Sequence, residues 1–206
     1  MKKMLLSLAA LAAGVGFASV HVDESKLWQE RIDAASANGG GVVEIPAGVH
    51  WVPKGLVLKD NVTLRVVRNA TLLGSTNGFD YIVGALVSAH GAKNIAIEGD
   101  GTLDAQGDKW ERRVFDANGR HVGWRNPDRA FNVCYLKECR NVRIEGVLMT
   151  NPASWTCFLN DCDGVVVRRL RIWSHGNTSN DGLDIASRNV LVEDCDIDSE
   201  DDSLVL

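Results

Sequence analysis

Three aspartates are the side chains of this sequence that could act together in acid and base chemistry. Asp201 and Asp202 are adjacent, and Asp181 matches Asp202 when residues 180–185 are laid over residues 201–206 at a constant offset of 21 residues. Carboxyl groups that lie close together raise at least one pKa, because their charges repel, and leave a protonated acid beside ionised neighbours. The spacing therefore predicts acid and base catalysis on an uncharged leaving group.

This offset belongs to a longer repeat that must position the acids. Nine-residue blocks with the same apolar pattern begin at Asn141 (N-V-R-I-E-G-V-L-M), Gly164 (G-V-V-V-R-R-L-R-I) and Asn189 (N-V-L-V-E-D-C-D-I), and weaker copies begin at Asn61 and Asn94. Strands this short cannot bury an apolar face alone, so the repeats must stack into a common core. We expect an all-β parallel β-helix, a single-stranded solenoid whose neighbouring strands lie about 4.8 Å apart.

Two other folds also have short strands at this spacing. A leucine-rich repeat would need a leucine ladder and a helix in every repeat, and the sequence has neither. An antiparallel sandwich has turns every 8–12 residues or so, but it does not require the blocks to match in register. The matching blocks therefore favour the parallel β-helix, in which turn residues such as Asn141 and Asn189 could stack on one another.

Residues outside the blocks predict a cap and an insertion. Leu27, the pair Arg31/Ile32 and Ala35 have helical spacing, and the run 38–41 (N-G-G-G) ends that pattern. A short N-terminal helix should cover the first coil and protect its sheet edge from pairing with other chains. The stretch 104–132 lacks strand periodicity, which indicates an insertion bordering the active face.

Composition and the first residues bear on location and partners. The chain has 206 residues, 45% of them apolar, and a net charge of −5, which fits one domain and argues against nucleic acid or an anionic membrane surface as a partner. Lys2 and Lys3 precede an apolar stretch and the small residues Ala18 and Ser19, so residues 1–19 read as a signal peptide, with a retained membrane anchor as the alternative. We expect a secreted or periplasmic protein without a membrane-bound part after removal of the leader.

The five cysteines are an odd number in a chain that is not small. Cys139 and Cys162 occupy the same repeat position and could form a bond between coils. Buried free thiols that pack as small hydrophobic groups are an equally good interpretation. We therefore assign no disulfide from the sequence.

The sequence also resembles a known family, the polygalacturonases and related pectin hydrolases of glycoside hydrolase family 28, from its beginning to its last residues. The similar segments are G-G-G-V-V-E-I-P-A-G (39–48), N-V-T-L (61–64), G-D-G-T-L-D-A-Q-G (99–107), N-P-A-S-W (151–155), S-N-D-G-L-D-I (179–185) and E-D-D-S (200–203). Single pieces are weak, but their order and the offset between the acids make the combination specific. The resemblance implies a right-handed parallel β-helix over residues 20–206 that cleaves α-linked galacturonic-acid-containing pectin with inversion and without a cofactor.

The resemblance also implies roles for the acids. Asp201 corresponds to the general acid, and Asp181 and Asp202 correspond to the groups that activate water. Ser179 and Asn180 stand where the family has Asn-Thr, and Glu200 stands where it has Gly or Gln. The later Gly-His-Gly and Arg-x-Lys motifs of the family are absent, so we expect a fold incomplete at its C-terminus, representing the N-terminal part of an enzyme that is a monomer when full length.

Other residues are candidates for contacts with a polysaccharide. His175 and Asn180 precede Asp181, and Trp110 and Trp124 in the insertion could stack on sugar rings. We expect Trp155 and Trp173 to pack between coils, and Asp184, Asp194, Asp196 and Asp198 to bond local backbone in turns.

Two other functions remain open on the sequence alone. One is a non-catalytic carbohydrate-binding β-helix or adhesin. The other is a Ca²⁺-dependent pectate lyase, since clustered carboxylates are good calcium ligands. A lyase would also need a basic residue beside the metal, and Arg168, Arg169 and Arg171 on a predicted strand are more typical of a solvated face.

Overall fold

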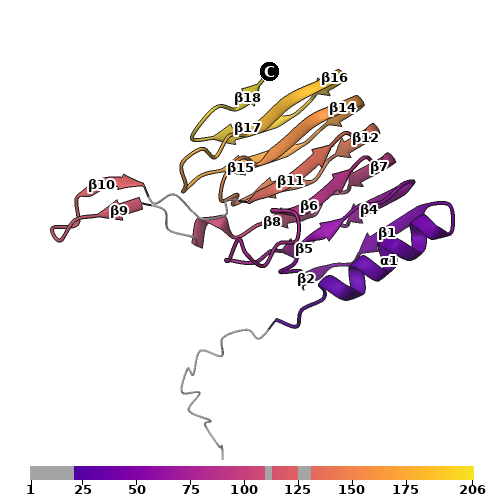
Figure 1. Ribbon diagram of the computed structural model, residues 1–206, viewed down its shortest axis with the longest axis horizontal. Coiled ribbons are helices and arrows are strands. Elements are labelled where there is room, and N and C mark those ends of the chain that lie inside the picture. The colour runs from indigo at the N-terminus through magenta and orange to yellow at the C-terminus, as the bar shows by residue number, and fades with distance from the viewer. Residues whose placement is uncertain (1–20, 110–112, 125–130) are drawn as a thin grey trace, which may run out of the picture.

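The computed structural model describes residues 21–109, 113–124 and 131–206. The leader expected over residues 1–19 and Trp110 lie outside these ranges. The described chain is a stack of parallel coils with one helix at its N-terminal end (Figure 1). No helix in the described part of the chain is both long and apolar enough to span a bilayer.

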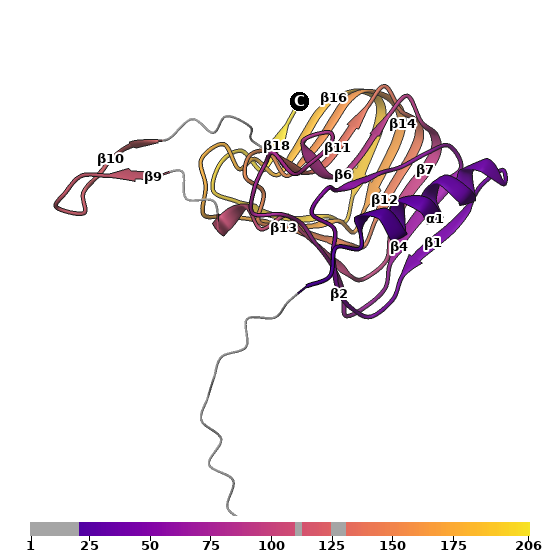
Figure 2. The same ribbon diagram turned by 60° about the horizontal axis from the view of Figure 1, so that its bottom comes forward.

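Each coil contributes strands to three faces of the stack, which Figure 2 shows in a turned view. The first face contains β3 (Leu56–Val57), β6 (Ala85–His90), β11 (Asn132–Lys137), the start of β14 (Cys157–Arg168), the start of β16 (Leu183–Glu193) and β18 (Leu204–Val205). The second face contains β1 (Gly41–Ile45), β4 (Val62–Val66), β7 (Lys93–Glu98), β12 (Arg140–Glu145) and the later parts of β14 and β16. The third face contains β2 (Gly48–Trp51), β5 (Ala70–Leu73), β8 (Thr102–Asp104), β13 (Leu148–Thr150), β15 (Arg171–Ser174) and β17 (Asp196–Ser199).

The repeated blocks form the second face in the predicted register. Val142 pairs with Ile95 on one side and with Val165 on the other, and Val165 pairs in turn with Val190. All these pairings are parallel, so equivalent side chains of successive coils lie one above another. The alternation of buried and half-buried residues along β4 and β12 sends valine, leucine and isoleucine into the core. The parallel β-helix is confirmed.

The cap is confirmed as helix α1 (Ser25–Ala37), but its buried face differs from the expected one. Trp28 and Ile32 are buried against the first coil, while Leu27 is 44% exposed. The indole of Trp28 donates to the Glu24 carboxylate over 2.8 Å and lies edge-on to the ring of His50. These contacts fix the rotation of the helix, because Trp28 buries more apolar area than Leu27 could.

The five cysteines are all free. Cys134 is in register with Cys157, and Cys139 lies beside Cys162, with all four buried in the core. The thiol of Cys162 is directed at the carbonyl oxygens of Leu136 and Asn160. They therefore pack as small hydrophobic residues with weak S–H donors.

The insertion between β8 and β11 contains more structure than the sequence indicated. A 3-10 turn, η1 (Gly107–Lys109), precedes an antiparallel hairpin of β9 (Arg113–Phe115) and β10 (His121–Trp124). The Asp116 carboxylate accepts hydrogen bonds from the backbone N–H groups of Asn118 and Arg120, which closes the turn of the hairpin. Strands of three and four residues are too short to display periodicity, which explains why the expectation of an irregular segment was wrong here.

The asparagines that stack on one another are not the pair that the sequence suggested. The Asn94 side chain donates to Asn61, and the Asn141 side chain donates to Asn94, each over 2.8 Å. Gly164 interrupts the row, and Asn189 donates to the Asp163 carboxylate over 2.7 Å. Asn141 and Asn189 therefore stack within separate groups and not on one another.

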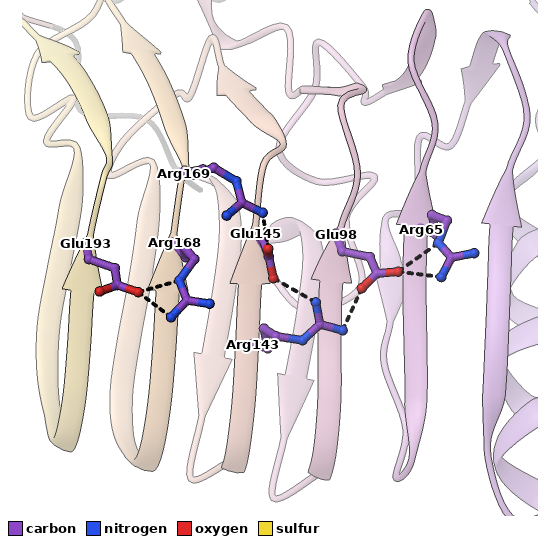
Figure 3. A network of polar contacts seen from close by, with 7 residues as sticks. All are labelled: Arg65, Glu98, Arg143, Glu145, Arg168, Arg169 and Glu193. Atoms are coloured by element: carbon purple, nitrogen blue, oxygen red, sulfur yellow. Dashed lines mark hydrogen bonds and ion pairs between the residues drawn. The ribbon is translucent and has the colours of Figure 1, made fainter.

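Arginine and glutamate side chains cross the coils on the outside of the second face (Figure 3). Glu98 binds Arg65 over 2.7 Å and Arg143 over 2.5 Å. Arg143 also binds Glu145, which accepts from Arg169, and Arg168 binds Glu193 on the next coil. Opposite charges at successive positions of a parallel stack are mutually stabilising, so these pairs link neighbouring coils.

Candidate active site

The loops that run from the third face to the first face come together at one edge of the stack. Residues 175–182 form such a loop between β15 and β16, and residues 200–203 form the equivalent loop between β17 and β18. Leu183 pairs with Leu204 in parallel, and the Gly182 amide donates to the Asp202 carbonyl over 2.8 Å. The predicted offset of the acids is therefore the register of the strands, and Asp181 lies beside Asp202.

The two loops approach each other closely at Gly182. A Cβ atom there would lie 2.6 Å from the Ser203 carbonyl oxygen, so only glycine fits. On the other side, the Thr156 amide donates to the Asp181 carbonyl over 2.8 Å. The carboxylate of Asp201 accepts from the amide of Asp202 over 3.1 Å. Backbone contacts thus fix Asp181 and Asp202 relative to the previous coil, and Asp201 is tied to Asp202.

The electrostatics of the site follow from this clustering. Asp181 is half-buried, whereas Asp201 and Asp202 are exposed. Partial burial raises the pKa of Asp181, and the negative charges of Asp201 and Asp202 raise it further. The three acids are therefore close enough to interact, and the expected upward shift occurs at Asp181.

A fourth carboxyl group belongs to the same cluster. Asp184 is 5% exposed in β16, and its Oδ2 atom has no hydrogen-bond partner among the described residues. Burial raises its pKa to about 7, and the charges of Asp181, Asp202 and Asp201 add to this effect. The expectation that Asp184 bonds local backbone in a turn was wrong, because this residue lies in a strand.

Strand alternation could have identified Asp184. Leu183 is buried in the core, so its neighbour Asp184 must lie on the outer side, where it continues a row formed by Tyr135 and Phe158 on the two preceding coils. An aspartate next in line after two aromatic residues on an outer face is an unusual surface residue, and that was the available signal.

Asn180 and Glu200 connect the two loops from inside. The Asn180 amide group donates to the Ser174 carbonyl over 2.9 Å and to the Glu200 carboxylate over 3.2 Å, and Asn180 is 1% exposed. Glu200 also accepts from the Gly176 amide over 2.7 Å. Asn180 therefore holds the loop and, contrary to the expectation, does not face a substrate.

The other predicted contact residues have different surroundings. The Nε2 atom of His175 lies 3.0 Å from the Asp198 carboxylate, and its ring centroid lies 5.0 Å from that of Trp173, so His175 stays a candidate at the border of the site. Trp124 ends β10 in the hairpin, and Trp110 lies outside the described residues. The start of the insertion does reach the site, because the Asn177 amide donates to the Gly107 carbonyl over 2.5 Å.

A pocket opens on the first face one coil before Asp181. It has a volume of about 350 Å³ and is lined by Val83, Gly84, Asn132, Tyr135, Ser154, Trp155 and Phe158. The rings of Tyr135 and Phe158 are stacked with centroids 5.4 Å apart, and Trp155 meets Phe158 edge-on at 5.0 Å. Trp155 is 37% exposed and Trp173 is 53% exposed, so the expectation that they pack between coils was wrong.

The arrangement bears on metal and base chemistry as well. In the ranges that the structure describes, no group of three or more His, Cys, Asp or Glu side chains is placed to hold a metal ion. Arg168 and Arg169 pair with glutamates on the second face. Arg171 binds the Gly146 carbonyl. None of these three arginines contacts the aspartates in the described structure.

The family model and similar curated proteins agree on one family. The model of Glycosyl hydrolases family 28 matches residues 30–206. A probable polygalacturonase of Arabidopsis thaliana is 27% identical over 116 residues, 55% of this chain and 23% of that protein. The endo-polygalacturonase of Pectobacterium carotovorum subsp. carotovorum is 25% identical over 183 residues, 81% of this chain and 43% of that protein.

A solved structure agrees with the sequence matches. The exopolygalacturonase of Thermotoga maritima superposes with a TM-score of 0.72 and 25% identity, covering 89% of this chain and 50% of that one. The chain spans less than half the length of the curated relatives it matches.

Proposed function

The chain belongs to glycosyl hydrolases family 28, and from this membership we propose that the protein hydrolyses α-linked galacturonic-acid-containing pectin with inversion at the anomeric carbon. The observation that carries the proposal is the cluster of Asp181, Asp201 and Asp202 at one edge, which the register of β16 and β18 brings together. Carboxyl groups in such a cluster can divide the roles of acid and base.

The roles within the proposed reaction follow from the chemistry of inversion. One carboxylic acid protonates the glycosidic oxygen as the bond to the anomeric carbon breaks. A carboxylate on the other side takes a proton from the attacking water, and the new bond forms on the face opposite the leaving group. From the positions that match the motifs of the family, we assign the acid to Asp201 and the activation of water to Asp181 and Asp202.

The stereochemical course tests the proposal directly. The protein is incubated with polygalacturonate, and the anomer released first is followed by proton NMR before mutarotation. Inversion predicts that the β-anomer appears first, and Asp201→Asn, Asp181→Asn or Asp202→Asn should each lower kcat by at least about 100-fold while oligosaccharide binding remains. A release of the α-anomer first, or full turnover in all three variants, would contradict the assignment.

Leaving-group chemistry separates the acid from the bases. An aryl α-galacturonide with a good leaving group needs no protonation, so Asp201→Asn should keep most of the parent activity on it. Asp181→Asn and Asp202→Asn should stay impaired, because water must still be activated. If Asp181→Asn is the variant that the activated substrate rescues, the roles of Asp181 and Asp201 are exchanged.

We also propose that the protein is exported and acts as a monomer on its polysaccharide. The basic and apolar pattern of residues 1–19 supports export. N-terminal sequencing of protein recovered outside the cytoplasm should find the mature chain beginning close to residue 20. Size-exclusion chromatography with light scattering should give the mass of one chain.

A further inference from the structure

We propose that the aromatic pocket one coil before Asp181 is a subsite for an uncharged pyranose ring, such as a neutral deoxy sugar or a methyl-esterified uronate. This inference rests on the proposed function for the nature of the polymer, but it concerns which of its units the protein selects. It would make the protein prefer segments of pectin in which one unit near the cleaved bond lacks an ionised carboxylate.

The walls of the pocket suit the apolar face of a sugar. Tyr135 and Phe158 lie on the outer side of neighbouring coils with parallel rings, and Trp155 closes one end of this surface edge-on to Phe158. Val83, which is 41% exposed, also lines the pocket, together with Gly84. Ring hydrogens and a methyl group can pack on such surfaces, as ligands do in mostly apolar pockets with a few polar groups.

The position of the pocket places it next to the reacting groups. Cys157 pairs with Leu183, so Trp155, two residues earlier, lies level with Asp181 on the next coil. Phe158 pairs with Asp184 in the same way. Neighbouring strands of a stack lie about 4.8 Å apart. A sugar in the pocket would therefore be a close neighbour of the unit at the proposed catalytic acids.

The charges around the pocket argue against an ionised carboxylate in it. Among the residues that the structure describes, the polar lining consists of Asn132, Ser154 and Tyr135, and no lining residue carries a positive charge. On the next coil, Asp181 lies level with Trp155 and would repel a uronate, and Asp184 would add to this repulsion once it is ionised. Lys137 lies two residues beyond Tyr135 on β11 and is engaged with Glu138 at 3.4 Å.

Binding measurements on the Asp201→Asn variant test this selection independently of turnover. Calorimetry would compare three oligosaccharides of equal length: oligogalacturonate, its methyl ester, and an oligomer alternating galacturonate with a 6-deoxyhexose. We expect at least one of the two ligands with uncharged units to bind more tightly than oligogalacturonate. Raising the salt concentration should strengthen binding of oligogalacturonate, because repulsion by the acids is screened. Tightest binding of oligogalacturonate, weakened by salt, would overturn the proposal.

Two substitutions assign the effect to the pocket. Trp155→Ala in the same background should weaken binding of the preferred ligand about three- to tenfold, as expected for one aromatic contact, and leave oligogalacturonate nearly unchanged. Val83→Lys adds a cation at an exposed lining position and should reverse the preference towards oligogalacturonate. The second variant keeps the test decisive if the first one unfolds.

The chain offers a matched control in Trp173, an exposed tryptophan on the third face. Trp173→Ala should leave the ratio of the affinities unchanged. Equal losses for all ligands in Trp155→Ala, together with no reversal in Val83→Lys, would refute the subsite even if the protein hydrolyses pectin. A selective pocket in a protein without hydrolytic activity would instead reject only the proposed function.

Discussion

At the scale of single residues, the buried carboxyl group of Asp184 links the site to the stability of the fold. Its pKa rises from an ordinary value of 3.8 to about 7, because burial and three neighbouring acids disfavour the charged form. Between these two values the folded protein holds a proton that the unfolded chain has released, so the free energy of unfolding falls as the pH rises. The stabilisation that comes from the proton on Asp184 is complete below about pH 4 and lost above about pH 7.

Asp184→Asn should therefore remove this pH dependence. The variant and the parent should be similarly stable at pH 4, and the variant should be more stable at pH 8 by up to about 4 kcal/mol, since one pKa unit corresponds to about 1.4 kcal/mol. Urea unfolding at pH 4, 6 and 8 measures the difference. Asp196→Asn changes an exposed aspartate on β17 and should keep the slope of the parent. An unchanged slope in Asp184→Asn would contradict the shifted pKa.

Glu200 is the second residue whose environment predicts an effect on function. One of its oxygens, Oε2, accepts from both the Gly176 amide and the Asn180 side chain, and so joins the loop of Asp181 to the loop of Asp201 and Asp202. The Gly176 amide, Asn180 and the adjacent His175 hold the pKa of Glu200 below its ordinary value, which keeps it ionised at neutral pH. Glu200 is thus a positioning residue for the aspartates.

Glu200→Ala should lower kcat on polygalacturonate about tenfold or more with little change in KM, because small displacements of reacting groups are costly. Glu200→Gln should restore most of kcat, since a single carbonyl oxygen can accept both hydrogen bonds. Glu193→Gln, which removes a carboxylate on the second face, serves as the control with parent kinetics. A rise in KM alone, or no rescue by glutamine, would argue against a positioning role.

At the scale of elements, the glutamate and arginine pairs of the second face connect strands that contribute little apolar surface on their outer side. Glu98 on β7 is the centre of one group, because it binds Arg65 on β4 and Arg143 on β12. Burial acts to raise the pKa of Glu98, but the hydrogen bonds and charges of the two arginines outweigh it and lower the pKa. The resulting stabilisation is present above the ordinary pKa and is lost as the pH falls through the lowered value.

Glu98→Gln should cost about 1–2 kcal/mol of unfolding free energy at pH 7, the usual contribution of hydrogen bonds to a charged group. The difference from the parent should shrink as the pH falls below 4. Glu44→Gln is the matched control, because Glu44 is exposed and lies 3.6 Å from the same Arg65; it should cost less than about 0.5 kcal/mol. Equal costs for both variants at pH 7 would show that burial of the pair does not matter.

The elements were predictable where the pattern is repeated and less so where it occurs once. Five blocks in register were enough to identify the second face, since one shared apolar pattern is tested at every copy. The rotation of α1 was missed because Leu27 and Trp28 are both apolar, and only the contact of Trp28 with His50 and Glu24 decides between them. Packing against a distant segment is not encoded in local spacing.

In the candidate site, too, the repeated feature was predictable and the features that occur once were not. The offset between Asp181 and Asp202 could be read directly, because it equals one coil. The burial of Asn180 and Asp184 could not be predicted from the sequence, because it depends on how the loops fold over the first face. The exposure of Trp155 could not be predicted either, because it follows from the place of Trp155 in a pocket that three separate segments create.

At the scale of the whole molecule, each coil pairs its strands with those of the neighbouring coils, so stability should be lost from an end of the stack inward. Helix α1 covers the N-terminal end, with Trp28 2% exposed and Ile32 fully buried against the first coil. The guanidinium of Arg31 lies 4.4 Å above the Trp28 ring and adds a cation–π contact. Removing this cap should expose the edge of β1 while leaving the central coils paired.

Trp28→Ala should therefore lower the unfolding free energy of the first coils by about 3 kcal/mol or more, the usual cost of truncating a buried aromatic residue. In native-state hydrogen exchange, amides of β1 and β2 should lose protection, while amides of β12 and β14 should stay close to the parent. Leu27→Ala changes an exposed residue of the same helix and should leave every strand protected. A uniform loss of protection along the stack would mean that the coils unfold as one cooperative unit and not from the capped end.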